Sequence, residues 1–204
     1  MPEKQEEKEW QWLDVDHITY AVRDIRLWRF IYVHNFGFRE IHHTPDASPD
    51  GASSMELYGL EKGKSRIALV RPINRSSLSH VELFLRLHGD HSVQHVAHGI
   101  RNLEAFICDM KERGFHFVGA IKQRYDLFGP IKQIFAKRFD GDLEPAQGFF
   151  YEFVERPIKM DEQSIAAFFS SSVAGELYEE IEHEQDSARG GDNDCFLQRL
   201  CRPI

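Results

Sequence analysis

The sequence lacks three features that would each mark a whole class of proteins. No apolar run approaches the roughly 20 residues that are needed to span a bilayer, and the segment from Met1 to Gln11 is charged rather than signal-like. Basic residues are not in excess, since 25 lysines and arginines stand against 33 aspartates and glutamates, giving a net charge of -8. A nucleic-acid surface needs a basic patch to neutralise phosphates. We therefore expect a cytoplasmic protein whose partners include neither a nucleic acid nor a membrane.

Cysteine is also scarce, with three residues in the chain. Cys108 lies in a helical pattern, whereas Cys195 and Cys201 lie in a polar tail, and their spacing matches no zinc motif. We expect reduced thiols and assign no chemistry to them. The 42% hydrophobic content over 204 residues suffices for one full-sized core, or for two small repeats that share one.

What the chain does contain is an internal duplication. The segment 15–25 (VDHITYAVRDI) is echoed by the segment 93–103 (VQHVAHGIRNL), and His17 and His95 occupy the same position in the two copies. A repeat that carries one histidine early in a strand can bring two imidazoles to one metal ion. The duplication therefore predicts a metal site between two similar units.

The pattern of apolar residues predicts the same order of elements, βαβββ, in both copies. We therefore predict an α+β protein in which two tandem units form one curved mixed sheet around a metal cleft, followed by a C-terminal helix. The predicted segments are an N-terminal arm (1–12), a first unit (13–74), a linker (75–91), a second unit (92–159), a C-terminal helical lid (160–186) and a disordered tail (187–204).

A carboxylate supplies the third candidate ligand. Glu152 lies in the middle of a strand that is otherwise almost wholly apolar, and a buried carboxylate needs a cation, a partner or a raised pKa. Taken singly, a strand histidine is usually satisfied by a hydrogen bond, and a strand glutamate can face solvent. Together, His17, His95 and Glu152 form the set of two histidines and one carboxylate that suits non-haem Fe(II) with open positions.

These residues resemble the vicinal oxygen chelate superfamily, which includes glyoxalase I, extradiol dioxygenases and 4-hydroxyphenylpyruvate dioxygenase. The sequence is most similar to the C-terminal, catalytic half of the last family, over roughly residues 13–185. Residues 93–97 (VQHVA) resemble its second histidine motif, residues 133–137 (QIFAK) a Gln-Ile-Phe-Thr-Lys strand, and residues 150–154 (FYEFV) the strand that carries its carboxylate ligand.

The resemblance implies that His17, His95 and Glu152 bind Fe(II) and are the catalytic centre. It also implies a set of residues that line the substrate pocket, the last of them on a C-terminal helix that covers the active site. These residues are Asn74, His80, Gln94, Gln133, Phe135, Phe150 and Phe169. Leu177 would be a further inward contact of that helix.

The activity that the resemblance implies is an Fe(II)-dependent dioxygenation. A 2-oxo acid, in the first instance an aromatic one, would be oxidatively decarboxylated and hydroxylated with dioxygen as the second substrate. The sequence departs from the family in four places. The N-terminal, non-catalytic half is absent, so the surface that it covers must be exposed, remodelled or buried in a homo-oligomer. His80 replaces a pocket glutamine, Gly59 stands near an expected serine, and a longer insertion is shortened to about residues 122–130.

Two other functions remain open. A glyoxalase-like metal isomerase or lyase often draws a carboxylate from each unit, but the counterpart of Glu152 in the first unit falls near Ile67 or Ala68, neither of which is an acid. A non-catalytic binding protein of the same fold would not need all three ligand types. Both alternatives are therefore less favoured than the dioxygenase.

Overall fold

The computed structural model describes residues 9–136 and 148–156, and it confirms the predicted α+β class with two βαβββ units. The first unit consists of β1 (Gln11–Ala21), α1 (Ile25–Phe30) with the π-helical turn η1 (Ile31–Asn35), β2 (Arg39–Thr44), β3 (Ser53–Lys62) and β4 (Ser65–Asn74). The second consists of β5 (Ser92–Arg101), α3 (Leu103–Glu112), β6 (Phe117–Asp126), β7 (Gly129–Ala136) and β8 (Phe150–Glu155). The predicted lid and tail lie outside the described residues.

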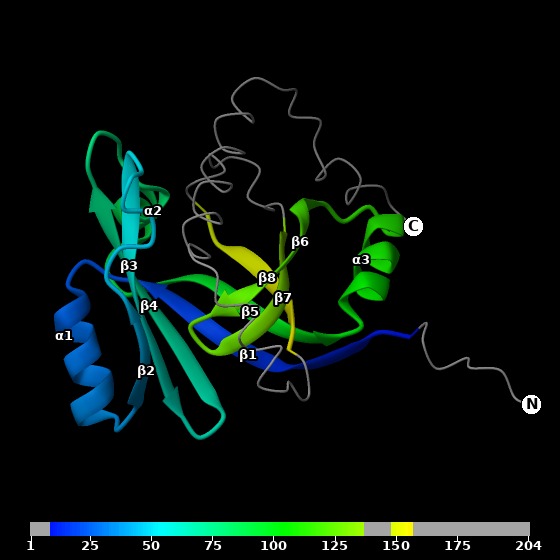
Figure 1. Cartoon of the computed structure of the whole chain (residues 1–204), viewed down its shortest axis with the longest axis horizontal. Helices are drawn as coiled ribbons and strands as arrows, with labels where there is room; N and C mark the ends of the chain where they lie inside the picture. The colour runs from blue at the N-terminus through cyan, green and yellow to red at the C-terminus, as the bar shows by residue number, and fades with distance from the viewer. Residues whose placement is uncertain (1–8, 137–147, 157–204) are drawn as a thin grey trace, which may run out of the picture.

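All described strands belong to one eight-stranded sheet with the order β2-β3-β4-β1-β5-β8-β7-β6. Within each unit the first strand pairs in parallel with the last, β1 with β4 and β5 with β8. The two units meet where β1 and β5 pair antiparallel in the middle of the sheet, and these two strands cross the molecule from one half to the other (Figure 1). The duplication therefore places its two histidine-bearing strands side by side.

The connection between the units, predicted only as a linker, contains the helix α2 (His80–His88). Ser79 caps this helix, because its hydroxyl accepts a hydrogen bond from the Glu82 amide at 3.0 Å. Val81, Phe84 and Leu85 are buried on one side of it, which is the spacing of an amphipathic helix. In the part of the chain that the structure describes, no helix combines the length and apolarity that crossing a bilayer requires.

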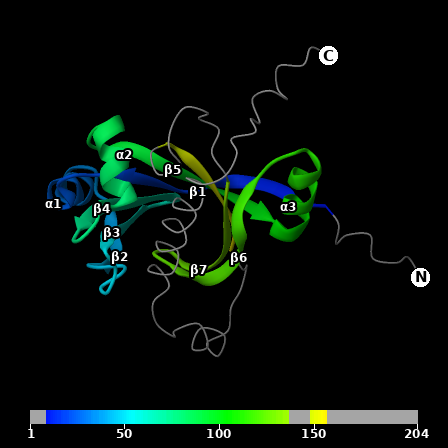
Figure 2. The same cartoon turned by 90° about the horizontal axis from the view of Figure 1, so that it is seen from above.

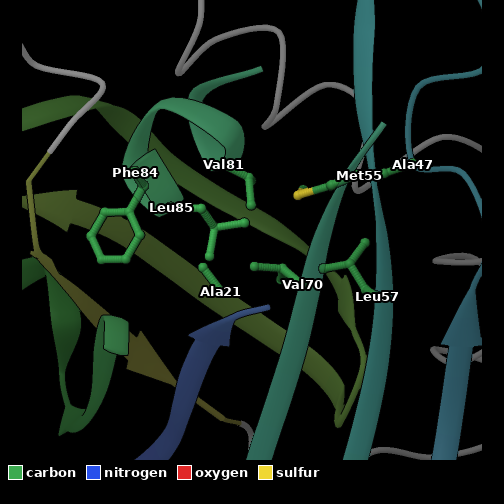
Figure 3. Packing of buried hydrophobic residues seen from close by; sticks show 8 residues of the cluster. All are labelled: Ala21, Ala47, Met55, Leu57, Val70, Val81, Phe84 and Leu85. Atoms are coloured by element: carbon green, nitrogen blue, oxygen red, sulfur yellow. The ribbon is translucent and has the colours of Figure 1, made fainter. Parts of the chain in front are cut away.

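The helices cover both faces of the sheet. We call the face that carries Ala21 and Val70 the inner face and the face that carries Ile67 and Leu69 the outer face. On the outer face, α1 packs against Ile67 and Leu69 of β4, and α3 packs against Phe153 of β8. On the inner face of the first unit, α2 packs against Val70 of β4 and Ala21 of β1, and these side chains point toward one another (Figure 3). The view from above shows α2 and α3 over opposite ends of the sheet (Figure 2). The inner face of the second unit carries no described helix.

Candidate metal centre

The two repeated histidines share the inner face of the sheet. His17 lies two residues before Thr19 on β1, and Thr19 is paired directly with His95 on β5. Alternate residues of a strand point to the same side, so both imidazoles lie on one face. Their ring centroids are 5.8 Å apart, and the rings are nearly perpendicular at 82°.

The third predicted ligand joins them from β8. Glu152 pairs with Ala97, and its Oε2 lies 3.3 Å from Nε2 of His17 and 3.5 Å from Nε2 of His95. One ligand atom from each of the three residues lies within 4.8 Å of the others, and Glu152 is 3% exposed. The structure thus brings together three side chains that are far apart in the sequence.

The first unit contributes only a histidine to this group. In the second unit, Glu152 pairs with Ala97, which lies two positions after His95. In the first unit, the residue two positions after His17 is Thr19, and its partner is Ala68. Ala68 is buried and has no polar side chain. The expectation that the counterpart of Glu152 is not an acid is therefore confirmed, and the ligand set is asymmetric.

The donor set fits a divalent metal ion. Imidazole nitrogens and a carboxylate oxygen are ligands for first-row metals, and among the described residues the two imidazoles are the only ion-pairing partners of the Glu152 carboxylate, His95 being one only when protonated. Two buried polar atoms on this face, Nδ1 of His95 and Oγ1 of Thr19, have no hydrogen-bond partner within residues 9–136 and 148–156. A cation held between the imidazoles and Glu152 would offset the charge of this buried carboxylate.

The two histidines differ in their protonation. Burial lowers the pKa of both imidazoles, but hydrogen bonds to Asp16 and Glu152 reverse the effect for His17 and raise its pKa to about 9. For His95 burial prevails, and together with the nearby charges of His17 and His80 it lowers the pKa to about 3. Without an ion, the group therefore holds its proton on His17 and keeps His95 neutral.

A β-bulge places Asp16 beside His17. Val15 pairs with His98 and His17 with the preceding residue Ala97, so Asp16 is an extra residue in β1. Such a residue bends the strand and redirects side chains. Oδ1 of Asp16 lies 2.9 Å from Nδ1 of His17, on the side of the ring away from Glu152.

A second bulge lies at the equivalent place in the other unit. Thr19 pairs with His95 and Tyr20 with Val93, so Gln94 is the extra residue in β5. Gln94 is buried. The ring of His95 stacks on the ring of Phe150, with centroids 4.7 Å apart and an interplanar angle of 25°.

A partly buried arginine holds Asp16 in place. Arg156 donates to Asp16 through Nε at 2.6 Å and through Nη2 at 2.7 Å, and it binds Asp126 at 2.6 and 3.0 Å. Nη1 of Arg66 also donates to Oδ2 of Asp16, at 3.4 Å. The second cluster of possible ligands, formed by Asp16, His17 and Asp126, is therefore already neutralised by guanidinium groups.

The turn between β6 and β7 covers His17. The ring of Phe128 lies 5.1 Å from the imidazole, with the guanidinium groups of Arg66 and Arg156 at 5.6 and 5.8 Å from the Phe128 ring. The segment 122–130, expected as a shortened insertion, is mostly strand, because β6 runs to Asp126 and β7 begins at Gly129. A tight turn thus brings an aromatic side chain to the centre.

Of the predicted pocket residues, five are buried around the inner face. Phe135 pairs with Glu152 and its ring lies 5.5 Å from that of Phe150; Gln133 and Gln94 are each 3% exposed. His80 is buried at the start of α2 and lies close enough to lower the pKa of His95.

The remaining predicted residues are placed differently. Asn74 is exposed, and its side-chain oxygen accepts a hydrogen bond from the Ser79 amide at 3.0 Å, so it shapes the turn before α2. Among the described residues, no hydrogen bond or ion pair joins it to the three candidate ligands. Phe169 and Leu177 lie outside the described part of the chain.

Three residues beside the centre were not singled out from the sequence, namely Asp16, Phe128 and Arg156. The sequence held one signal for Asp16, since it directly precedes a duplicated histidine and occupies the position that Gln94 has in the second copy. Phe128 and Arg156 gave no such signal, because only the folded sheet brings them to His17.

Comparison with solved structures shows the same fold in several enzymes. A triple mutant of 4-hydroxymandelate synthase from Streptomyces coelicolor superposes with a TM-score of 0.67 at 19% identity, over 86% of this chain and 56% of the synthase. Methylmalonyl-CoA epimerase from Mycobacterium tuberculosis gives 0.54 at 21%, over 76% of this chain and 91% of the epimerase. A variant of the Streptomyces coelicolor epimerase bound to 2-nitronate-propionyl-CoA gives 0.54 at 21%, over 74% and 99%. At these identities the likeness concerns the fold.

The sequence itself matches a family model. The model of the Glyoxalase/Bleomycin resistance protein/Dioxygenase superfamily aligns with residues 16–130, which include both repeated histidines. No curated protein matches the sequence. The chain spans little more than half the length of the synthase. The duplication, the sheet order and the family match lead to one conclusion: the chain belongs to the Glyoxalase/Bleomycin resistance protein/Dioxygenase superfamily.

Proposed function

We propose that the chain is an Fe(II)-dependent dioxygenase that oxidatively decarboxylates and hydroxylates a 2-oxo acid. The observation that carries the proposal is the asymmetric group of His17, His95 and Glu152, whose ligand atoms lie within 4.8 Å of one another. Two histidines and one carboxylate are the donor set of non-haem Fe(II) oxygenases with open positions. When bound, Fe(II) would supply the redox chemistry and the open coordination positions for the oxo acid and dioxygen.

The aromatic residues around His95 support an aromatic substrate such as 4-hydroxyphenylpyruvate. Phe150 stacks on the imidazole, and Phe135 lies with its ring centroid 6.2 Å from that of His95. Apolar rings beside the ligands bind an aromatic side chain and keep water away from the reacting group. Gln133, buried on the same side of β7 as Phe135, would orient a polar group of the substrate.

A metal-dependent isomerase is the second candidate, because two epimerase structures are matched over nearly their whole length. Such an enzyme would use the same ligands to polarise a carbonyl group and would need no dioxygen. Ala68 in the place of a second carboxylate disfavours it if the reaction requires an acid from each unit.

Oxygen consumption separates the candidates. Protein purified without chelators is loaded anaerobically with Fe(II) and offered phenylpyruvate, 4-hydroxyphenylpyruvate, 2-oxoglutarate and 4-methyl-2-oxopentanoate in turn. We expect one molecule of dioxygen to be consumed and one of carbon dioxide released per molecule of the preferred 2-oxo acid. Glu152→Gln should abolish the uptake, whereas Glu104→Gln, an exposed glutamate that binds Lys132, should leave it unchanged.

The opposite result would be equally clear. No substrate-dependent oxygen uptake by protein that demonstrably contains iron would overturn the dioxygenase. Exchange of the α-proton of an acyl-CoA ester with deuterated water under anaerobic conditions would instead favour the isomerase.

A further inference from the structure

We propose that Asp16 is a positioning residue, whose carboxylate holds the imidazole of His17 so that Nδ1 carries the proton and Nε2 is presented to the metal. The inference rests on the metal centre of the proposed function, but not on the reaction or its substrate. Within the described residues, Asp16 forms no hydrogen bond or ion pair with Glu152 or His95; it acts through His17.

The bulge in β1 makes this contact available. In a regular strand neighbouring residues point to opposite faces of the sheet, so Asp16 would face away from His17. Asp16 is the extra residue between Val15 and His17, whose partners His98 and Ala97 are consecutive in β5. Its side chain therefore lies beside the imidazole, with Oδ1 2.9 Å from Nδ1. The opposite nitrogen, Nε2, is then the one that faces Glu152, at 3.3 Å.

The charge of Asp16 is fixed by its other partners. A guanidinium group that donates two hydrogen bonds to a carboxylate favours its ionised form, and Arg156 does so to Asp16. Its Oδ1 accepts from His17 and from Nη2 of Arg156, while its Oδ2 accepts from Nε of the same arginine. A carboxylate gripped in this way has little freedom to turn, so it fixes the ring orientation and the tautomer of the histidine.

The second histidine provides an internal contrast. Nδ1 of His95 is buried and has no hydrogen-bond partner among the described residues, and the residue equivalent to Asp16 is the amide Gln94. His95 is oriented by ring stacking on Phe150. Support by a carboxylate is therefore a property of the first unit alone.

Asp126 is a matched control for a purely structural role. It binds the same arginine through two hydrogen bonds, as Asp16 does, and a carboxylate oxygen of each lies within 4.8 Å of a nitrogen of His17. Of the two carboxylates, only that of Asp16 is hydrogen-bonded to the imidazole. Removing either carboxylate takes two hydrogen bonds from Arg156, and Asp126 also accepts one from the Phe128 amide at 2.8 Å. A larger effect of Asp16→Ala on the metal centre therefore points to the contact with His17.

The test compares Asp16→Ala, Asp16→Asn and Asp126→Ala by anaerobic titration with Co(II). Partners of metal-bound histidines typically account for about 10–100-fold in metal affinity. We expect Asp16→Ala to raise the Kd for Co(II) by about 10–100-fold, Asp16→Asn to raise it less because an acceptor oxygen remains, and Asp126→Ala to raise it clearly less than Asp16→Ala does.

A second measurement reads the tautomer directly. In Zn(II)-loaded protein with 15N-labelled histidine, the ring of His17 should show a protonated Nδ1 and a metal-bound Nε2, and Asp16→Ala should weaken or exchange the Nδ1 proton signal while Asp126→Ala preserves it. Equal Kd values and unchanged ring signals in Asp16→Ala and Asp126→Ala would overturn the positioning role. If the unmodified protein binds neither Co(II) nor Zn(II), the metal centre itself is wrong and the inference fails with it.

Discussion

Two equivalent residues, Asp16 and Gln94, precede the two histidines, and the difference between them gives each imidazole a different support. His17 has a charged hydrogen-bond partner at Nδ1, whereas the ring of His95 stacks on the ring of Phe150. Stacking restrains the plane of a ring but leaves the tautomer open, while a hydrogen bond sets both. The two copies of one ancestral segment thus hold their ligands by different means.

The stacked pair yields a prediction. Phe150→Leu removes the ring under His95 in a buried position, so we expect a loss of about 1–2 kcal/mol in the free energy of unfolding, as for other core substitutions, together with weaker Co(II) binding. Urea denaturation without metal gives the first quantity and titration the second. Phe36→Leu, at a phenylalanine that is 52% exposed, should change neither. Unaltered Co(II) affinity in Phe150→Leu would argue against an orienting role for the ring.

At the scale of elements, the turn between β6 and β7 links the two units. Leu127 at its tip packs against the apolar cluster of the first unit. It fits there because Gly59 on β3 has no side chain at the point of contact. A Cβ atom added at Gly59 would lie 2.9 Å from Cβ of Leu127 and 3.4 Å from its carbonyl oxygen. The absence of a side chain at Gly59 therefore allows the two halves of the curved sheet to approach each other.

Gly59→Ala should push this turn away. Because the contact is with a Cβ atom and backbone rather than with the end of a flexible side chain, we expect the variant to lose about 1–3 kcal/mol in the free energy of unfolding. Phe128 should also move from His17, which would appear as faster hydrogen exchange of the amides in 126–129. An equally stable variant with unchanged exchange would show that the turn does not rest on β3.

A second link joins α1 to the turn before β5. The carboxylate of Asp90 accepts hydrogen bonds from the Arg23 amide at 2.7 Å, from Trp28 Nε1 at 3.0 Å and from the His91 amide at 3.0 Å. The imidazole of His91 stacks on Trp28 with ring centroids 3.6 Å apart. This contact fastens the helix of the first unit to the strand that begins the second.

The Asp90 contact should depend on pH. Burial would raise the pKa of Asp90, but its three N–H donors lower it below the usual value, so the folded state binds fewer protons than the unfolded state near the unfolded pKa of about 3.9. The contribution of the ionised Asp90 to the free energy of unfolding is complete above that pH, and it is lost as the pH falls through the pKa of the folded state. Asp90→Asn should therefore be less stable than the unmodified protein at pH 7, by about 1 kcal/mol, and the gap in urea midpoint should narrow below pH 4. A constant gap down to pH 3 would contradict this assignment.

At the scale of the whole molecule, the candidate metal centre connects the two units. His17 comes from β1 of the first unit, and His95 and Glu152 come from β5 and β8 of the second. An ion bound by all three would act as a cross-link between the halves of the sheet. Metal binding and global stability should therefore rise together.

A ligand at 100 times its Kd stabilises the native state by about 2.7 kcal/mol, and about 1 kcal/mol corresponds to roughly 2–4 °C for a chain of this size. We expect saturating Co(II) to raise the Tm by roughly 5–10 °C on these two estimates, in a differential scanning experiment without chelators. Glu152→Gln should remove the increment, and Glu104→Gln should retain it. An equal shift in both variants would place the binding elsewhere.

The whole-molecule comparison also explains what could be predicted from the sequence. The duplication and the alternation of apolar residues located the strands, because burial on a sheet imposes period two on each strand. His17, His95 and Glu152 were predicted because the repeat and an acidic residue in an apolar strand are both visible locally. The helix α2 was missed because its single apolar turn, Val81 to Leu85, is too short to distinguish from a linker.

The residues around the ligands could not be predicted in this way. Arg156 binds Asp16 across almost the whole described chain, and no local pattern records a contact at that distance. The bulges are equally hidden, since an extra residue in a strand is defined only by its partner. The residues that support the candidate ligands can therefore be identified only from the tertiary structure, whereas the candidate ligands themselves can be predicted from the sequence pattern.

The sheet order has a consequence for the way in which the protein is assembled during synthesis. The strand β8 is the last of the eight along the chain, yet it lies between β5 and β7. Until β8 emerges from the ribosome, the hairpin of β6 and β7 has no neighbouring strand that joins it to the rest of the sheet. The two histidines also lack Glu152 until then. A nascent chain that stops before residue 150 therefore lacks the closed second half and the carboxylate at the same time, so the last strand to be made completes both.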